Sequence, residues 1–69
     1  MSFILKENIA NMIKGKYKNS YFSEKLNLSG TYISLILHRK KAVAKHMAYA
    51  FTKAIDSNAE IYDMFDQVK

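Results

Sequence analysis

The amino-acid sequence predicts an all-α fold of five short helices, folded as a single domain over residues 1–69. Apolar residues recur three and four positions apart along the chain, which is the spacing of one helix face. Alternation of apolar and polar residues, the pattern of a strand, never extends beyond a few positions. A hydrophobic fraction of 49% is ample for one packed core, and 69 residues are too few for two domains.

The first predicted helix begins near Ser2, whose hydroxyl can cap it. It ends at Gly15 or Lys16, because glycine favours the left-handed turn that follows a helix. Its inward face would consist of Leu5, Ile9, Met12 and Ile13. A polar stretch at residues 16–19 separates this helix from the next.

The second predicted helix is short and ends in a tight turn. Asn19 or Ser20 can cap its start. Phe22 and Leu26 lie four residues apart and share its inner face. Asn27 follows where the helix must stop, and asparagine tolerates a left-handed backbone better than most residues. We therefore expect a left-handed turn at this position.

A third helix is expected to follow, with Ser29 as its N-cap. Its inward stripe would consist of Ile33, Ile36 and Leu37. Its outward face would carry Gly30, Thr31, Ser34, Leu35 and His38. A basic cluster, Arg39-Lys40-Lys41, comes directly after it.

The fourth helix is expected over about residues 44–56, with an inward stripe of Met47, Phe51, Ala54 and Ile55. Ser57 and Glu60 then have the spacing of a capping box, in which each side chain caps the other's backbone. They predict a fifth helix in the last part of the chain. Its apolar stripe would consist of Ile61, Met64 or Phe65, and Val68, opposite an acidic face.

The net charge of +5 is unevenly distributed along the chain. Residues 1–55 contain ten basic and two acidic side chains, a net charge of +8. Residues 56–69 contain one basic and four acidic side chains, a net charge of −3. This division favours a basic face for a polyanion, with the acidic end directed away from it. The alternative interpretation is a solvated surface that keeps a small protein soluble.

No group of residues has the pattern of an enzyme, a metal site or a cofactor site, and we expect none of them. His38 and His46 have no cysteine near them and lack the spacing of zinc ligands. Gly15 and Gly30 belong to no glycine-rich phosphate loop, and no serine is set with histidine and aspartate as in a catalytic triad. The longest apolar run, residues 47–51, is far shorter than the ~20 residues of a membrane span.

Two short helices, a three-residue turn and a basic cluster are typical of a helix-turn-helix. Phe22-Ser23 stands where one known family favours Leu-Ala, Leu26-Asn27-Leu28-Ser29 where it favours Leu-Gly-Val-Ser, and Tyr32-Ile33-Ser34 closely matches its recognition helix. On these motifs, residues 19–38 resemble the helix-turn-helix of the lambda repressor and Cro-like family of phage and bacterial regulators. The resemblance continues through residues 47–51, which are similar to the family's fourth helix.

The chain departs from the family pattern at three positions. Asn19 replaces the usual glutamine at the start of the second helix, and an asparagine can still donate to a phosphate. Ser23 replaces a small apolar residue and is small enough for the close crossing of the two helices. Arg39 replaces a common glycine, which leaves the path out of the third helix open.

The resemblance implies that the third helix lies in the major groove of double-stranded DNA. The implied base-contacting residues are Gly30, Thr31, Ser34 and Leu35. The implied phosphate-contacting residues are Lys18, Asn19, Ser20, Tyr32, His38, Arg39, Lys40 and Lys41. Because no Arg, Gln or Asn lies on the outward face before His38, specificity would depend partly on DNA shape. Leu35 could instead contact a partner, and Tyr32 could instead belong to the edge of the core.

The implied function is a sequence-specific transcriptional regulator, a Cro-like repressor that occludes a promoter in the cytoplasm of a bacterium or a phage-infected bacterium. Such proteins bind near-palindromic operators as homodimers. The interface expected here consists of Tyr62, Phe65 and Val68, which could equally close the core. We expect no small-molecule effector and no membrane association.

A protein-interaction module on the same fold is the alternative function, for example a phage-encoded inhibitor of a host factor or an antitoxin. The shortage of base-contacting side chains favours it, and the basic cluster disfavours it.

Overall fold

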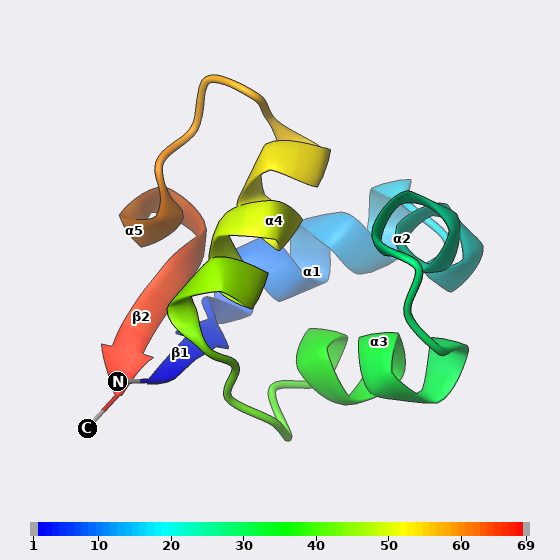
Figure 1. Ribbon diagram of the computed structural model, residues 1–69, viewed down its shortest axis with the longest axis horizontal. Helices are drawn as coiled ribbons and strands as arrows, with labels where there is room; N and C mark the ends of the chain where they lie inside the picture. The colour runs from blue at the N-terminus through cyan, green and yellow to red at the C-terminus, as the bar shows by residue number, and fades with distance from the viewer. Residues whose placement is uncertain (1, 69) are drawn as a thin grey trace.

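Residues 2–68 are described by a computed structural model and form five helices and two strands (Figure 1). In chain order they are β1 (Ser2–Leu5), α1 (Glu7–Lys16), α2 (Asn19–Leu26), α3 (Gly30–Leu37), α4 (Lys45–Ile55), α5 (Ile61–Met64) and β2 (Phe65–Val68). The Cα trace fits within 29 × 24 × 21 Å. The protein is a small, mostly helical domain with a two-stranded antiparallel sheet formed by its first and last elements.

The prediction of an all-α fold without strands is wrong at both ends of the chain. β1 and β2 pair antiparallel, with Leu5 opposite Phe65. Phe3 and Leu5 are buried while Ser2 and Ile4 are half-buried, which is the alternation of a strand with one face on the core. Four residues are too few for this alternation to be distinguished from helical spacing in the sequence.

The segment predicted to form a long fifth helix divides into α5 and β2. α5 has only four residues, and at Phe65 the backbone becomes extended, with φ −127° and ψ 149°. The predicted capping box between Ser57 and Glu60 is wrong. The box is formed by Glu60 and Asp63, and the Glu60 N–H donates to the Asp63 carboxylate at 2.9 Å. Pairing with β1 buries Phe65, and no local pattern in the sequence contains that information.

The first helix is shorter than predicted, because its expected first turn belongs to β1. α1 begins at Glu7 and ends at Lys16, the predicted end. Ala10 and Ile13 form its buried face. Met12, which was expected to face inward, has 38% of its surface exposed.

α4 has nearly the predicted extent and the predicted inner face. Phe51 is fully buried, and Met47, Ala54 and Ile55 are half-buried against the core. Ala48 and Thr52 are buried as well. The Thr52 hydroxyl donates to the Ala48 carbonyl at 2.8 Å, so its burial leaves no polar atom without a partner.

A line of aromatic rings forms the centre of the core and joins α2, α4 and β2. The rings of Phe22 and Phe51 are stacked, with centroids 4.5 Å apart and planes 14° apart. Phe51 meets Phe65 edge-on at 6.2 Å. Tyr21 adds a polar tie, because its hydroxyl donates to the Ala54 carbonyl at 2.8 Å. Each of these contacts joins elements that are distant in sequence.

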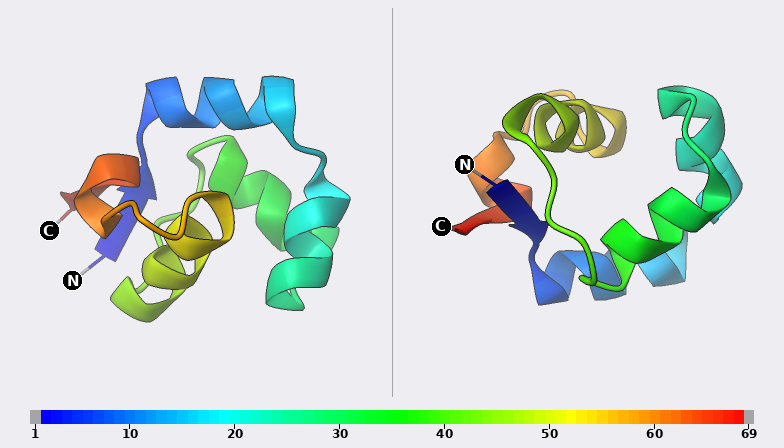
Figure 2. Two further views of the ribbon diagram at one scale, coloured as in Figure 1. Left: turned by 90° about the horizontal axis from the view of Figure 1, so that it is seen from above. Right: turned by 60° about the horizontal axis from the view of Figure 1, so that its bottom comes forward.

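Figures 1 and 2 show α2 at one side of the molecule and α5 with the sheet at the other. α3 leads from α2 towards the sheet, and its C-terminal end packs near both α1 and β1 (Figure 2). β1 is also bridged to the chain after α3, because Phe3 and Val43 exchange two backbone hydrogen bonds of 2.8 Å. No helix in residues 2–68 combines the length and the apolar character needed to cross a membrane.

Candidate nucleic-acid interface

The turn between α2 and α3 is fixed by several local interactions. Asn27 has φ 55° and ψ 47°, which confirms the predicted left-handed turn. The Ser23 hydroxyl donates to the Leu28 carbonyl across the turn. The Ser29 Oγ accepts from the Tyr32 N–H at 3.2 Å, which confirms Ser29 as the N-cap of α3. The two helices are therefore joined by a turn with a defined conformation.

The packing of α3 leaves its outward face uncovered. Ile33, Ile36 and Leu37 are buried, as the sequence predicts. The four base-contact candidates lie on the opposite side. Of these, Gly30, Thr31 and Leu35 are exposed and Ser34 is half-buried.

The start of α2 presents the first group of phosphate-contact candidates. Lys18, Asn19 and Ser20 are all exposed. The prediction that Asn19 or Ser20 caps the helix is wrong, because Lys18 occupies the N-cap and makes no side-chain capping bond. No side chain caps the start of α2, where the Tyr21 N–H donates to the Lys18 carbonyl at 3.1 Å.

The end of α3 presents the second group, and Arg39 has a different role from its neighbours. Arg39 has φ 58°, the left-handed conformation usually taken by glycine. Its N–H donates to the Ile36 carbonyl, and the N–H of Lys40 donates to the Leu35 carbonyl, at 3.1 and 2.9 Å. These two bonds form a Schellman motif, which satisfies the last carbonyls of the helix.

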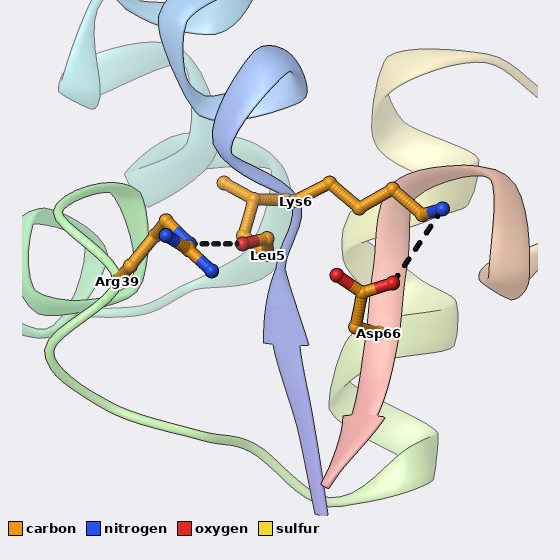
Figure 3. A network of polar contacts seen from close by, with 4 residues as sticks. All are labelled: Leu5, Lys6, Arg39 and Asp66. Carbon is orange, nitrogen blue, oxygen red and sulfur yellow. Dashed lines mark hydrogen bonds and ion pairs between the residues drawn. The ribbon is translucent and has the colours of Figure 1, made fainter.

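The Arg39 side chain ties the end of α3 to the sheet (Figure 3). Its Nε donates to the Leu5 carbonyl at 2.9 Å, and its Nη1 lies 4.0 Å from the Glu7 carboxylate. Sequence reasoning placed Arg39 among the phosphate contacts and missed this structural bond. The sequence contains one indication of such a bond. Arg39 stands at a helix end where the resembled family commonly has glycine, and a side chain at such a position needs a compensating contact.

The remaining candidates of this group differ in their surroundings. Lys40 and Lys41 are exposed, and the Lys41 ammonium lies 5.7 Å from the centre of the Tyr32 ring. Tyr32 is half-buried and packs against the core, so it lies at the edge of the core rather than free in solvent. His38 is exposed, and its Nδ1 lies 2.8 Å from the Ser34 carbonyl.

The three dimer-interface candidates differ in their exposure. Tyr62 is 54% exposed and meets Phe3 edge-on at 5.9 Å. Phe65 is 1% exposed, so it belongs to the core and is not available to a partner. Val68 is half-buried at the end of β2.

The acidic residues of the last elements lie on the side of the molecule away from α2. Asp66 forms an ion pair with Lys6 at 3.5 Å across the sheet (Figure 3). Asp63 belongs to the capping box of α5. Within residues 2–68, no three histidine, aspartate or glutamate side chains are grouped closely enough to hold a metal ion.

Comparisons with known proteins add no assignment to this geometry: no protein-family model, no curated protein and no solved structure matches the chain.

Proposed function

We propose that this protein is a sequence-specific, double-stranded DNA-binding transcriptional regulator. Residues 19–38 would act as a helix-turn-helix of the lambda repressor and Cro-like kind, with α3 in the major groove and α2 across the backbone. The observation that carries the proposal is the hydrogen-bonded α2–turn–α3 unit, whose second helix has an exposed outward face, with the exposed Lys18 before α2 and the exposed Lys40 and Lys41 after α3.

The outward face of α3 can make modest contacts with base edges. Thr31 and Ser34 have hydroxyl groups that donate and accept, and Leu35, 37% exposed, can contact a thymine methyl group. Nothing within the chain requires a glycine at Gly30, because a Cβ there would meet no atom within 4 Å and its φ is not positive. Close approach of a partner to the backbone would explain a glycine at this position.

The groups on either side of α3 supply contacts to the phosphate backbone. Lys18, Asn19 and Ser20 are exposed at the start of α2, and Lys40 and Lys41 are exposed directly after α3. Such contacts fix the register of a protein on DNA and give most of its affinity without specifying sequence.

The mode of action we propose is repression by promoter occlusion, as a homodimer on a near-palindromic operator in a bacterial or phage-infected cell. Tyr62 and Val68 are the interface residues of this proposal, because Phe65 is buried. The acidic side of α5 and β2 would then lie away from the DNA, next to the second copy.

The test is selection of bound sequences from random duplexes, followed by measurement of affinity against salt on the enriched sequence. We expect a motif with two-fold symmetry and a steep fall of affinity with salt. The double variant Lys40→Ala/Lys41→Ala should reduce the slope of log K against log salt by about 1.8, which is two phosphate contacts. The control Lys16→Ala/Lys25→Ala removes the same charge from exposed positions outside the interface and should leave the slope nearly unchanged.

Two results would count against DNA binding: no enriched motif, or equal salt slopes for the two double variants. The second candidate function is a protein-interaction module on the same fold. It is favoured by the exposed Leu35 and by the absence of Arg, Gln and Asn from the outward face before His38. Under this alternative, Leu35→Ala would abolish function while Lys40→Ala/Lys41→Ala would preserve it at physiological salt.

A further inference from the structure

We propose that the cleft between α1 and the C-terminal end of α3 binds a phosphate group through Lys14, His38 and Arg39. The cleft has a volume of about 330 Å³, and its polar lining consists of Glu7, Asn11, Lys14, His38 and Arg39. This volume is at the lower end of the range of small-molecule sites, roughly 300–1,000 Å³. Its lining is mainly polar, which suits a small anion and not an apolar ligand.

The charges of the lining favour an anion. Lys14 and Arg39 contribute two positive charges and Glu7 one negative charge, so the net charge at neutral pH is +1. The Glu7 carboxylate lies 4.0 Å from Arg39 Nη1 and is 77% exposed, so solvent screens it strongly. Arg39 donates its Nε–H to the Leu5 carbonyl, which holds the guanidinium at the cleft, and its Nη groups have further N–H donors.

His38 contributes its ring to the lining of the cleft, beside Lys14 and Arg39. Its Nδ1 lies 2.8 Å from the Ser34 carbonyl oxygen and 3.3 Å from the Ser34 hydroxyl, so the ring is held against the end of α3. An imidazole N–H can donate to a phosphate oxygen.

Two sources could supply the phosphate group. It could belong to the DNA backbone, in which case the inference rests on the proposed function and adds Lys14 and Asn11 to the interface. It could also belong to a small phosphorylated molecule, which is independent of DNA binding. Nothing in the sequence distinguishes Lys14 from a solvated surface lysine. The cleft is formed by the packing of α1 against the end of α3, which is a tertiary contact.

The first experiment titrates the full chain with inorganic phosphate and follows backbone amides by NMR, with chloride at equal ionic strength as the reference. Phosphate should shift the amides of Asn11, Lys14 and His38. Lys14→Ala should weaken binding by about fivefold or more, the scale of one lost charge-assisted hydrogen bond.

Lys16→Ala is the matched control, since Lys16 is also exposed on α1 but does not line the cleft. It should bind phosphate as the unmodified chain does. His38→Ala should weaken phosphate binding, because it removes the imidazole ring from the lining of the cleft. Circular dichroism of each variant checks that its helical content is unchanged.

The second experiment measures binding of the same variants to the duplex enriched by selection. If the phosphate belongs to DNA, Lys14→Ala should lose about tenfold in affinity and about 0.9 in salt slope, while Lys16→Ala changes affinity by less than about twofold. Phosphate binding combined with equal DNA affinities of the two variants would assign the cleft to a small phosphorylated molecule.

The cleft proposal is overturned if inorganic phosphate shifts none of the cleft amides and the two lysine variants bind DNA equally. A chain that binds no duplex would overturn the proposed function instead. In that case the phosphate titration by itself decides whether the cleft is an anion site.

Discussion

Arg39 has a backbone conformation in which an L-residue with a side chain costs about 1–2 kcal/mol relative to an ordinary helical residue. The hydrogen bond of its Nε to the Leu5 carbonyl compensates for this cost, because it satisfies a carbonyl at the end of β1. The sequence leaves the path out of α3 open at this position, and it predicts neither the left-handed conformation nor the bond. At the scale of one residue, local chemistry and tertiary contact together explain why arginine is tolerated.

Substitution of Arg39 separates these two effects. Arg39→Ala keeps the left-handed backbone and removes the bond, so the free energy of unfolding should fall by about 1–2 kcal/mol. Arg39→Gly also removes the bond but relieves the backbone, so it should be about 1 kcal/mol more stable than Arg39→Ala. Urea unfolding followed by circular dichroism measures both, with the exposed Lys40→Ala as the control. Equal stabilities of the glycine and alanine variants would contradict this account.

Ser29 tests the capping of α3 in the same way. Ser29→Ala removes the acceptor for the Tyr32 N–H and should lower the free energy of unfolding by about 1 kcal/mol. Ser57 is an exposed serine outside any helix, so Ser57→Ala should change stability by less than about 0.5 kcal/mol. Thermal unfolding of the two variants provides the comparison. A similar loss in both would mean that Ser29 contributes nothing specific as a cap.

At the scale of elements, the helices and the sheet depend on different information. The extents of α2, α3 and α4 follow from interactions between residues that are close in sequence. These are the apolar spacing of each helix, the left-handed Asn27 that ends α2, and the Ser29 cap that begins α3. β1 and β2 depend on each other, because each strand satisfies the backbone of the other and neither is stable alone. A four-residue strand has no periodicity long enough to be recognised, which explains why helices were predicted at both ends.

Substitution of the buried Phe65 tests how much β2 contributes to the stability of the fold. Phe65→Ala should lower the free energy of unfolding by about 3 kcal/mol or more, because it removes a fully buried ring from contact with Phe51. The exposed Gln67→Ala in the same strand should have an effect below about 0.5 kcal/mol. Phe65→Leu should lose about 1 kcal/mol and keeps the test usable if the alanine variant does not fold. Equal stability of the alanine variant and the unmodified chain would place Phe65 outside the core.

At the scale of the whole molecule, positive charge is in excess over most of the chain. The sequence assigns +8 to residues 1–55 and −3 to the remainder, and the fold places the acidic elements away from α2. Among residues 2–68, two exposed ion pairs join basic and acidic side chains, Lys6 with Asp66 and Arg39 with Glu7. Most of the positive charge is therefore not neutralised locally, and it repels itself in the folded state.

Salt should stabilise the folded protein as a result. Raising NaCl from about 0.01 M to about 0.15 M shortens the Debye length from about 30 to about 8 Å and screens this repulsion. The thermal midpoint should rise by a few degrees, measured by circular dichroism. Lys16→Gln/Lys25→Gln, which removes two exposed charges, should show a smaller rise. A midpoint that falls with salt in the unmodified chain would show that ion pairs outweigh repulsion.

The proposed dimer is tested through Tyr62, the exposed member of the three candidates. Tyr62→Ala should leave the thermal midpoint of dilute protein nearly unchanged and weaken self-association by about tenfold or more, as loss of an aromatic anchor does. Sedimentation at several concentrations measures the association. Tyr49→Ala is the matched control, because Tyr49 is equally exposed on α4 and belongs to no predicted interface. Equal association of both variants would place the interface elsewhere.

The sequence alone determined the features that act over short distances. These are the α2–turn–α3 unit, with its left-handed Asn27 and its Ser29 cap, the inner faces of α3 and α4, and the division of charge along the chain. They could be predicted because helix capping, turn conformation and apolar spacing depend on neighbouring residues.

Tertiary structure alone decided the rest. The sheet, the tie from Arg39 to Leu5, the burial of Phe65 and the cleft that joins Lys14 to His38 all bring together residues from distant parts of the chain. Each depends on a partner whose position is set by the packing of the whole core. No local pattern encodes that position, and so these features become visible only in the folded molecule.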